Sequence, residues 1–193
     1  MDVTIATLPP ERWPEAGAMA GRAFWTEEYM KVLADDPIGL YATVQDLYLG
    51  MDVSGPTTTV LGAFAGPHVV GIAWIEAPEA CFFCAMDPNA AAPADRPGQV
   101  MHAVSVAIHE LHAGLPPHAN IGPLAVEPTL QGQGIGGRLL EAAWETAVGM
   151  RPETVSLDCD PRLLSFYEGF GFRPVARVTD PWGFEIVGLR RDP

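Results

Sequence analysis

The stretch that decides the fold runs from Ile121 to Val148 and reads IGPLAVEPTLQGQGIGGRLLEAAWETAV. It opens with an apolar run typical of a buried strand, and Pro128 ends that run. A short loop then carries four glycines within six residues, which are Gly132, Gly134, Gly136 and Gly137. Apolar residues at helical spacing follow directly: Ile135, Leu139, Leu140, Ala143 and Ala147. The pattern predicts a strand, a glycine-rich loop and a helix in direct succession.

A glycine-rich loop at the start of a helix is typical of sites that bind phosphate. The first amides of a helix have no partner within it, and the helix dipole makes that end partly positive. Glycines lack the Cβ atoms that would keep an anion away from those amides. We therefore predict a pyrophosphate site formed by Gln131, Gly132, Gln133, Gly134, Ile135, Gly136 and Gly137. The alternative is that these glycines serve only a tight turn and close packing.

Two classes of phosphate ligand fit this loop. The sequence has no G-K-[ST] motif here, which excludes a nucleoside-triphosphate loop. The spacing Gly132-x-Gly134-x-x-Gly137 fits a dinucleotide fingerprint, and Asp158 lies where its ribose-binding acid is expected. However, residues 128–131 separate the glycines from the strand, and too little chain follows for a doubly wound sheet. A nicotinamide-dependent oxidoreductase is therefore the less favoured alternative.

The loop also contains the pattern Q-x-x-G-x-G, beginning at Gln131, after the apolar strand Leu124-Ala125-Val126. Further on, the segment from Asp160 to Val175 reads DPRLLSFYEGFGFRPV, a short helix ending in F-Y and then G-F before a strand. Together these two segments resemble the acetyl-coenzyme A motifs of the GNAT superfamily of N-acetyltransferases. The pattern FYE-x-x-GF and the segment from Trp74 to Glu79 also resemble the puromycin N-acetyltransferase-like branch. The strong match covers residues 119–175.

This resemblance implies a GNAT-like α/β fold, in which helices flank a central mixed and mostly antiparallel sheet, as a single N-acetyltransferase domain over residues 1–193. It implies direct transfer of an acetyl group from acetyl-CoA to a primary amine in a ternary complex. A bulge would leave the edge of the strand open, so that pantetheine adds to Leu124, Ala125 and Val126 as a further strand. Arg138 would help the loop to hold the pyrophosphate. Tyr167 would give a proton to the departing thiolate.

The residues alone give a weaker case for the catalytic groups. A phenol and an alkyl thiol have similar reference pKa values, about 10 and 8.5, so proton transfer from Tyr167 is nearly balanced. The alternative is a core aromatic residue. For the base that deprotonates the amine, Glu127 at the end of the central strand is the first candidate, and Glu76 and His118 are the others. Each of the three also has a solvated or structural interpretation.

Composition limits the partners. The chain has 24 acidic and 11 basic residues, for a net charge of −13, which disfavours nucleic acid. The acidic surplus either attracts a cationic amine or simply aids solubility. No apolar run reaches the length of a membrane span, and MDVTIATLPPE lacks a secretory pattern, so we expect a cytoplasmic protein without membrane contact. A small-molecule amine is the favoured acceptor; protein or peptide acetylation and non-catalytic acetyl-CoA binding are alternatives, and a homodimer is possible.

The three cysteines do not by themselves indicate a metal site. Cys81 and Cys84 have C-x-x-C spacing, but there is no second pair. Zinc would need two further ligands. The candidate histidines are scattered along the chain, at His102, His109, His112 and His118. We therefore expect free thiols, Cys159 included, and no metal.

The rest of the sequence predicts strands over residues 3–8, 58–65, 69–76, 154–159, 173–179 and 184–189. It predicts helices over 27–33, 40–51 and 98–115, one that begins at residue 13, and a short one after residue 160. Residues 78–97 are expected to form a loop.

Overall fold

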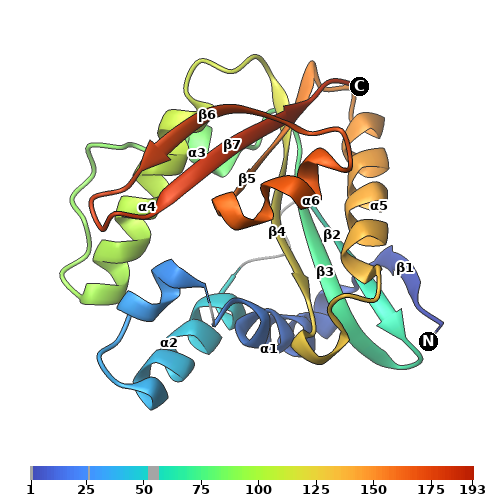
Figure 1. Cartoon of the computed structure of the whole chain (residues 1–193), viewed down its shortest axis with the longest axis horizontal. Helices are drawn as coiled ribbons and strands as arrows, with labels where there is room; N and C mark the ends of the chain where they lie inside the picture. Colours follow the sequence, from blue (N-terminus) through green and yellow to red (C-terminus); the bar gives the residue numbers. More distant parts are fainter. Residues whose placement is uncertain (1, 26, 52–56) are drawn as a thin grey trace.

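The computed structural model describes residues 2–25, 27–51 and 57–193 (Figure 1). Seven strands form one sheet in the order β1-β2-β3-β4-β5-β7-β6. The strands are β1 (Thr4–Thr7), β2 (Thr58–Ala65), β3 (His68–Glu76), β4 (His118–Val126), β5 (Thr154–Cys159), β6 (Arg173–Thr179) and β7 (Glu185–Arg191). The α-helices are α1 (Trp13–Phe24), α2 (Pro37–Leu49), α3 (Phe82–Ala85), α4 (Arg96–His112), α5 (Ile135–Gly149) and α6 (Leu164–Glu168). Short 3-10 turns occupy Pro10–Arg12, Glu28–Val32, Pro128–Leu130 and Pro161–Leu163.

The predicted mixed and mostly antiparallel sheet is confirmed. Of the strand pairs in the described ranges, β4–β5 alone is parallel. A dinucleotide-binding fold needs a mainly parallel, doubly wound sheet. This topology therefore removes the oxidoreductase alternative.

Several element boundaries differ from the prediction by a few residues, and the region before β4 shows two of the differences. The segment predicted as a loop over 78–97 contains the single turn of α3. Helix α4 begins at Arg96 rather than Gly98, because the Asp95 carboxylate accepts the Gly98 amide proton at 2.8 Å and Pro97 suits a first turn. The 17-residue α4 lies against β6 and β7. No helix in the described ranges combines the length and apolar character needed to cross a bilayer.

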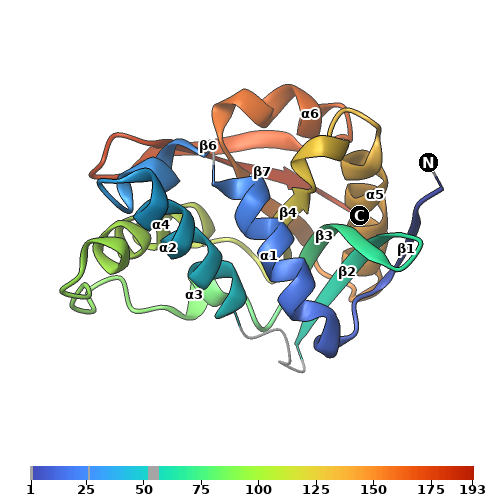
Figure 2. The ribbon, with the colours of Figure 1, turned by 90° about the horizontal axis from the view of Figure 1, so that it is seen from below.

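Helices cover both faces of the sheet, because residues along its strands alternate in direction. On β3, Ala73 and Ile75 belong to the core cluster that contains the apolar side of α5. Ile72 and Trp74 belong to a second cluster built with α1 and α2. In Figure 2, α1 crosses in front of β2, β3 and β4, and α5 lies behind them. The central strands are thus buried on both sides.

Strand β4 separates from β5 halfway along its length (Figure 1). His118–Asn120 pairs with Thr154–Ser156, and no β5 partner is found for the rest of β4 within the described chain. On its other side, the pairing of β4 with β3 shifts at Gly122-Pro123, where two residues oppose one and form a bulge. The edge of β4 that faces β5 is consequently open along Leu124–Val126. This is the open edge that the sequence led us to expect.

Candidate active site

The glycine loop has a backbone that requires glycine at two positions. Gly132 and Gly134 have φ values of +75° and +80°, in the left-handed region. At Gly137 the reason is space, because a Cβ atom would lie 2.7 Å from the Phe170 ring. At Gly136 a Cβ atom would make only ordinary contacts, the nearest at 3.7 Å. Turn geometry and close packing therefore account for three of the four glycines.

The same loop leaves backbone donors free. Gly134 is the N-cap of α5, so no side chain caps this helix, and its first turn has no acidic residue. Within the described chain, none of the amides of residues 132–137 has an assigned acceptor. Residues 132–134 are also exposed. An exposed helix start with free amides can bind an anion.

The other predicted cofactor residues flank this loop. The Gln131 side-chain amide donates to the Val126 carbonyl at 3.2 Å, which ties the loop to the end of β4. Gln133 is exposed. Arg138 donates to the Val3 carbonyl at 2.6 Å, which directs this guanidinium toward β1. On the strand, Leu124 is half-buried, and Ala125 and Val126 are buried.

A cavity of about 370 Å³ borders the loop on its α1 side; it is lined by Arg22, Ala23, Trp25, Tyr41, Pro128 and Gln131. Arg22 forms an ion pair with Glu127, with the guanidinium Nη2 2.8 Å from the carboxylate Oε2. Glu127 is therefore paired rather than free in water. Arg22 had no signal in the sequence, because 105 residues separate it from its partner.

Tyr167 lies on α6 and is almost fully buried, with 7% of its surface exposed. Its ring makes edge contacts with Phe166 and Phe172, and it belongs to the core cluster that includes α5. Burial raises the pKa of Tyr167, and the negative charges of nearby acidic groups raise it further. The phenol therefore stays protonated at neutral pH. It is also a weaker acid than the reference values suggested.

Glu27 is a carboxyl group near Tyr167 that the sequence analysis missed. It is half-buried just before the 3-10 turn Glu28–Val32, and Arg162 donates to it at 3.1 Å. Arg162 also holds Asp160 at 2.8 Å. Burial raises the pKa of Glu27 and Asp160 adds to this rise, whereas Arg162 opposes it. Glu27 is among the charges that raise the Tyr167 pKa, so the two groups share one region.

The other two base candidates lie at the opposite end of β4. His118 begins this strand, nine residues before Glu127, a separation of about 25–30 Å in an extended chain. The Nδ1 atom of His118 lies 2.9 Å from the Pro116 carbonyl oxygen. Glu76 is buried, and it accepts from the Asn120 amide at 3.2 Å and the Phe82 backbone at 3.4 Å. Both are held by structural contacts away from the glycine loop.

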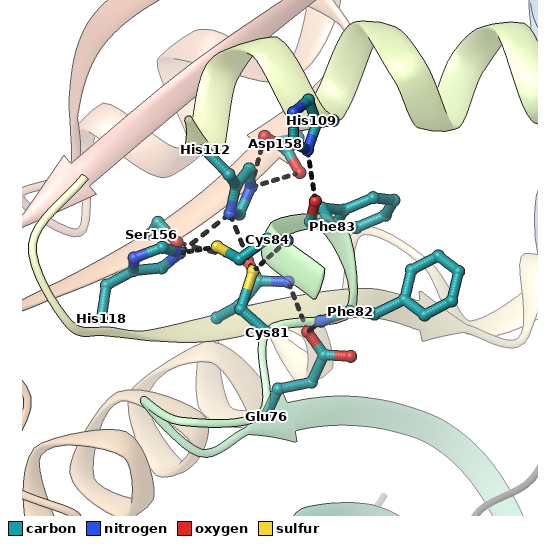
Figure 3. A network of polar contacts seen from close by, with 11 residues as sticks. Glu76, Cys81, Phe82, Phe83, Cys84, His109, His112, His118, Ser156 and Asp158 are labelled. Carbon is teal, nitrogen blue, oxygen red and sulfur yellow. Dashed lines mark hydrogen bonds and ion pairs between the residues drawn. The ribbon is translucent and has the colours of Figure 1, made fainter. Parts of the chain in front are cut away.

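His118 instead belongs to a group that we call the Cys/His cluster, which consists of Cys81, Cys84, His112 and His118 (Figure 3). One side-chain atom from each of the four lies within 4.8 Å of the others. Two of the four histidines, His112 and His118, thus meet the two cysteines in space, which corrects the expectation that no metal ligands gather there. His109 points elsewhere, with its Nδ1 atom 2.7 Å from the Phe83 carbonyl oxygen.

Comparison with known proteins identifies the family. Residues 78–174, about half of the chain, match the family model described as acetyltransferase (GNAT) domain. The chain belongs to the GNAT acetyltransferases. A curated relative of this GNAT chain is protein ElaA of Escherichia coli, which is 33% identical over 73 residues. This alignment covers 37% of the chain and 48% of ElaA, so it spans only about half of that relative.

Solved GNAT structures share the fold over essentially the whole chain. A histone acetyltransferase HPA2 and related acetyltransferase from Corynebacterium glutamicum has a TM-score of 0.68 at 17% identity, covering 100% of this chain and 97% of its own. The polyamine N-acetyltransferase of Drosophila melanogaster has a TM-score of 0.66 at 15% sequence identity, and the alignment covers 100% of both chains. The PaiA N-acetyltransferase of Thermoplasma acidophilum, solved in complex with coenzyme A, has a TM-score of 0.61 at 16% sequence identity. This alignment also covers 100% of both chains.

Residues 78–174 therefore form a GNAT acetyltransferase domain, and GNAT enzymes use acetyl-CoA as their cosubstrate. The prediction of the superfamily is confirmed. The comparisons do not reach the level of the puromycin-like branch, which stays a prediction.

Proposed function

We propose that this GNAT enzyme, acting as a single domain, transfers the acetyl group of acetyl-CoA directly to a primary amine of a small molecule. One observation carries the proposal: the open edge of β4 leads into a loop whose amides have no assigned acceptor within the described residues. The amides of residues 132–137 bind the pyrophosphate. Pantetheine then extends the sheet along Leu124–Val126, as a peptide strand does in β-augmentation.

Charge supports this placement of the cofactor. The chain carries a net charge of −13, so an anionic cofactor must be held by local donors. Helix α5 supplies its N-terminal amides, and Arg22 lies in the cavity beside Gln131. Arg138 reaches the Val3 carbonyl with one of its donor nitrogens, and its exposed guanidinium has other donors for phosphate. These donors offset the repulsion between the acidic protein and the negatively charged phosphates of the cofactor.

Tyr167 serves as the proton donor to sulfur. Attack of the neutral amine on the thioester carbonyl forms a tetrahedral intermediate, and its collapse breaks the C–S bond. The departing thiolate takes the phenolic proton, and the proton that the new amide nitrogen loses restores the phenol through solvent. Burial disfavours the thiolate as it disfavours the phenolate, so both groups become weaker acids in the same environment. The transfer therefore stays balanced despite the raised pKa of the tyrosine.

Glu27 is the better candidate for the base that takes the ammonium proton. A carboxyl group with a raised pKa is a more effective base near neutral pH than an ordinary one. Glu127, the first candidate from the sequence, has one carboxylate oxygen bound by both Nε and Nη2 of Arg22. This leaves Glu127 as the alternative base, with its other oxygen available.

A small cationic amine fits the acceptor side better than a peptide does. The cavity beside the loop is compact, and two of its walls are the aromatic rings of Trp25 and Tyr41, 6.1 Å apart in an edge-to-face arrangement. Aromatic faces attract cations. A solved neighbour of the same fold acts on polyamines, and the acidic surplus of this chain would attract such substrates. Membership of the puromycin-like branch, from the motif resemblance, is part of the same proposal.

The test is a panel of primary amines with acetyl-CoA, monitored by release of free coenzyme A thiol. Removing a general acid or base costs about 10²- to 10⁴-fold in rate. We therefore expect losses of this size in kcat for Tyr167→Phe and Glu27→Gln, and a smaller loss for Glu127→Gln. Glu28→Gln is the matched control: Glu28 is an exposed neighbour that pairs with Lys31 and lies 4.0 Å from Arg162, so this change should affect the rate far less than Glu27→Gln does.

Three outcomes would contradict the proposal. If coenzyme A fails to stabilise the protein, the loop does not bind it. If coenzyme A binds but neither small amines nor peptides are acetylated, the chain is a non-catalytic acetyl-CoA-binding domain. If peptides alone are acetylated, the acceptor class is wrong while the chemistry stands.

A further inference from the structure

The Cys/His cluster has the ligand set and the separations of a tetrahedral metal site. Its members come from three places in the fold: the α3 turn supplies both cysteines, the last residue of α4 is His112, and the first residue of β4 is His118 (Figure 3). The Cys81 sulfur lies 3.3 Å from His112 Nδ1, and the Cys84 sulfur lies 3.8 Å from His118 Nε2. The two histidine nitrogens are 2.9 Å apart.

These distances match the edges of a zinc tetrahedron. With Zn–S bonds of about 2.3 Å and Zn–N bonds of about 2.05 Å, tetrahedral angles place sulfur about 3.6 Å from nitrogen and the two nitrogens about 3.3 Å apart. The three observed separations are within about 0.4 Å of those values, and all four ligand atoms lie within 4.8 Å of one another. A cation at the centre would draw the four side chains together from this arrangement.

The outer contacts fix which ring nitrogens are available. His112 Nε2 lies 3.3 Å from both carboxylate oxygens of Asp158, so this nitrogen carries a proton and donates it. His118 Nδ1 lies 2.9 Å from the Pro116 carbonyl oxygen, so it also donates. Each ring then turns an unprotonated nitrogen toward the other. A carboxylate or carbonyl behind each histidine is the usual second shell of a metal ligand.

Two lone pairs 2.9 Å apart repel unless a cation or a proton lies between them. A divalent cation satisfies both nitrogens and both sulfurs at once, whereas a shared proton leaves the cysteines unused. Two thiolates would balance its charge, which lowers the cost of burial. The backbone amide of Cys84 donates to the Cys81 sulfur at 3.3 Å, which holds this sulfur in place within the cluster.

We propose a closed, structural Zn²⁺ site whose four ligands are Cys81, Cys84, His112 and His118. The S₂N₂ set selects zinc over magnesium or calcium, which take oxygen ligands. Four protein ligands leave no open position, so the site is structural rather than catalytic. Cys84 is exposed while the other three ligands are buried, which gives the ion a path from solvent.

The ion would join three segments that are otherwise connected by loops. It ties the turn of α3 to the end of α4 and to the start of β4. Here β4 pairs with β5 through His118–Asn120, and Asn120 in turn holds Glu76 on β3. Zinc would thus fasten the α3–α4 side of the molecule to the paired half of the central strand. This role is independent of the acetyl transfer proposed above.

The experiment measures zinc in the full, tag-free chain purified under reducing conditions, by elemental analysis and by release to a colorimetric chelator. We expect about one zinc ion per chain. Replacing zinc by Co²⁺ should give a thiolate-to-cobalt charge-transfer band and the ligand-field bands of a tetrahedral ion. Chelation should lower the melting temperature.

Variants separate this site from adventitious binding. Cys84→Ala changes an exposed ligand, so the chain should fold and lose the ion. Asp158→Asn should weaken binding by about 10- to 100-fold, as loss of an outer-shell partner does, and Cys84→Ala by more. His102→Ala, on α4 but outside the cluster, is the matched control for His112→Ala and should retain full zinc.

Four results would overturn the proposal. The first two are a reduced chain that neither retains zinc nor binds added Zn²⁺ or Co²⁺, and a Cys84→Ala variant with unchanged zinc content. The others are a cobalt form without thiolate charge transfer, and a Cys81–Cys84 disulfide in protein purified under reducing conditions.

Discussion

Two single-atom changes in the glycine loop should move stability in opposite directions. Gly134→Ala forces an L-residue into a backbone with φ of +80°, at a cost of about 1–2 kcal/mol, although no neighbour lies within 4 Å of the new Cβ atom. Gly136→Ala places a methyl group at ordinary distance from Phe166, Val126 and Leu124, at 3.7–3.8 Å, inside the first turn of α5. There alanine is favoured over glycine by about 0.5–1 kcal/mol.

The expected shifts can be measured by scanning calorimetry. For a chain of this size each kcal/mol changes the melting temperature by about 2–4 °C. Gly134→Ala should therefore melt about 2–8 °C below the wild type, and Gly136→Ala about 1–4 °C above it. A Gly134→Ala variant that melts at or above the wild type would show that the loop does not require the left-handed backbone at residue 134.

The same pair tests whether the loop amides bind the cofactor. A saturating ligand at about 100 times its Kd stabilises the folded protein by about 2.7 kcal/mol. Coenzyme A should give this gain in the wild type and in Gly136→Ala, whose methyl group faces the core. The gain should shrink in Gly134→Ala, because strain displaces the amides. An undiminished gain in Gly134→Ala would refute the placement of the pyrophosphate.

Three further predictions follow from buried groups. The folded-state pKa of Glu27 is raised, so the stability of the wild type should fall as pH rises from about 4.5 through that pKa. Glu27→Gln should remove this fall, as urea midpoints between pH 4.5 and 7.5 would show. Glu28→Gln removes a smaller cause of the raised pKa, so this variant should only reduce the fall. A less stable Glu27→Gln at pH 7 would contradict the raised pKa. Burial raises the pKa of Cys159 to about 12, so iodoacetamide at pH 8 should modify this thiol only after unfolding, as peptide mass spectrometry would show. Phe172 is 1% exposed and contacts the rings of Trp144 and Tyr167. Phe172→Ala should therefore lower the free energy of unfolding, measured by chemical denaturation, by about 3–5 kcal/mol, and Phe172→Leu by less than about 1.5 kcal/mol. Equal losses for the two variants would refute tight packing at this residue.

Local patterns were sufficient for the fold because each signal lies within one element. The apolar run, the glycines and the helical spacing of 121–148 predicted β4 and α5, observed at His118–Val126 and Ile135–Gly149. The helical segment predicted after 160 is also observed, and the Asp160 carboxylate at its start accepts the Arg162 amide proton. Residues that meet from distant segments left no such trace. Glu27 and Arg162 are 135 residues apart, and only the folded chain brings them together.

The Cys/His cluster shows why spacing can fail even when its parts are regular. Cys81-x-x-Cys84 and His112-x₅-His118 each have the spacing found at zinc sites, but residues 85–111 separate them, more than in a zinc finger. Most of this insertion is α4, whose 17 residues extend for about 25 Å. The loop after Cys84 extends away from the cysteines, and α4 then leads the chain back to them. The contact between His109, near the end of α4, and the Phe83 carbonyl shows that the helix ends beside α3.

The helix itself decides which histidines reach the cysteines. His102 lies ten residues before His112, about 15 Å back along the axis, and so cannot reach the same centre. His112 and His118 stand on the two sides of the turn that contains Pro116-Pro117, where the chain passes from α4 into β4. A single helix here returns the chain to the C-x-x-C turn and places one histidine on each side of the turn that follows the helix. Predicted element boundaries can reveal such a pattern. The direct spacing of the four residues cannot.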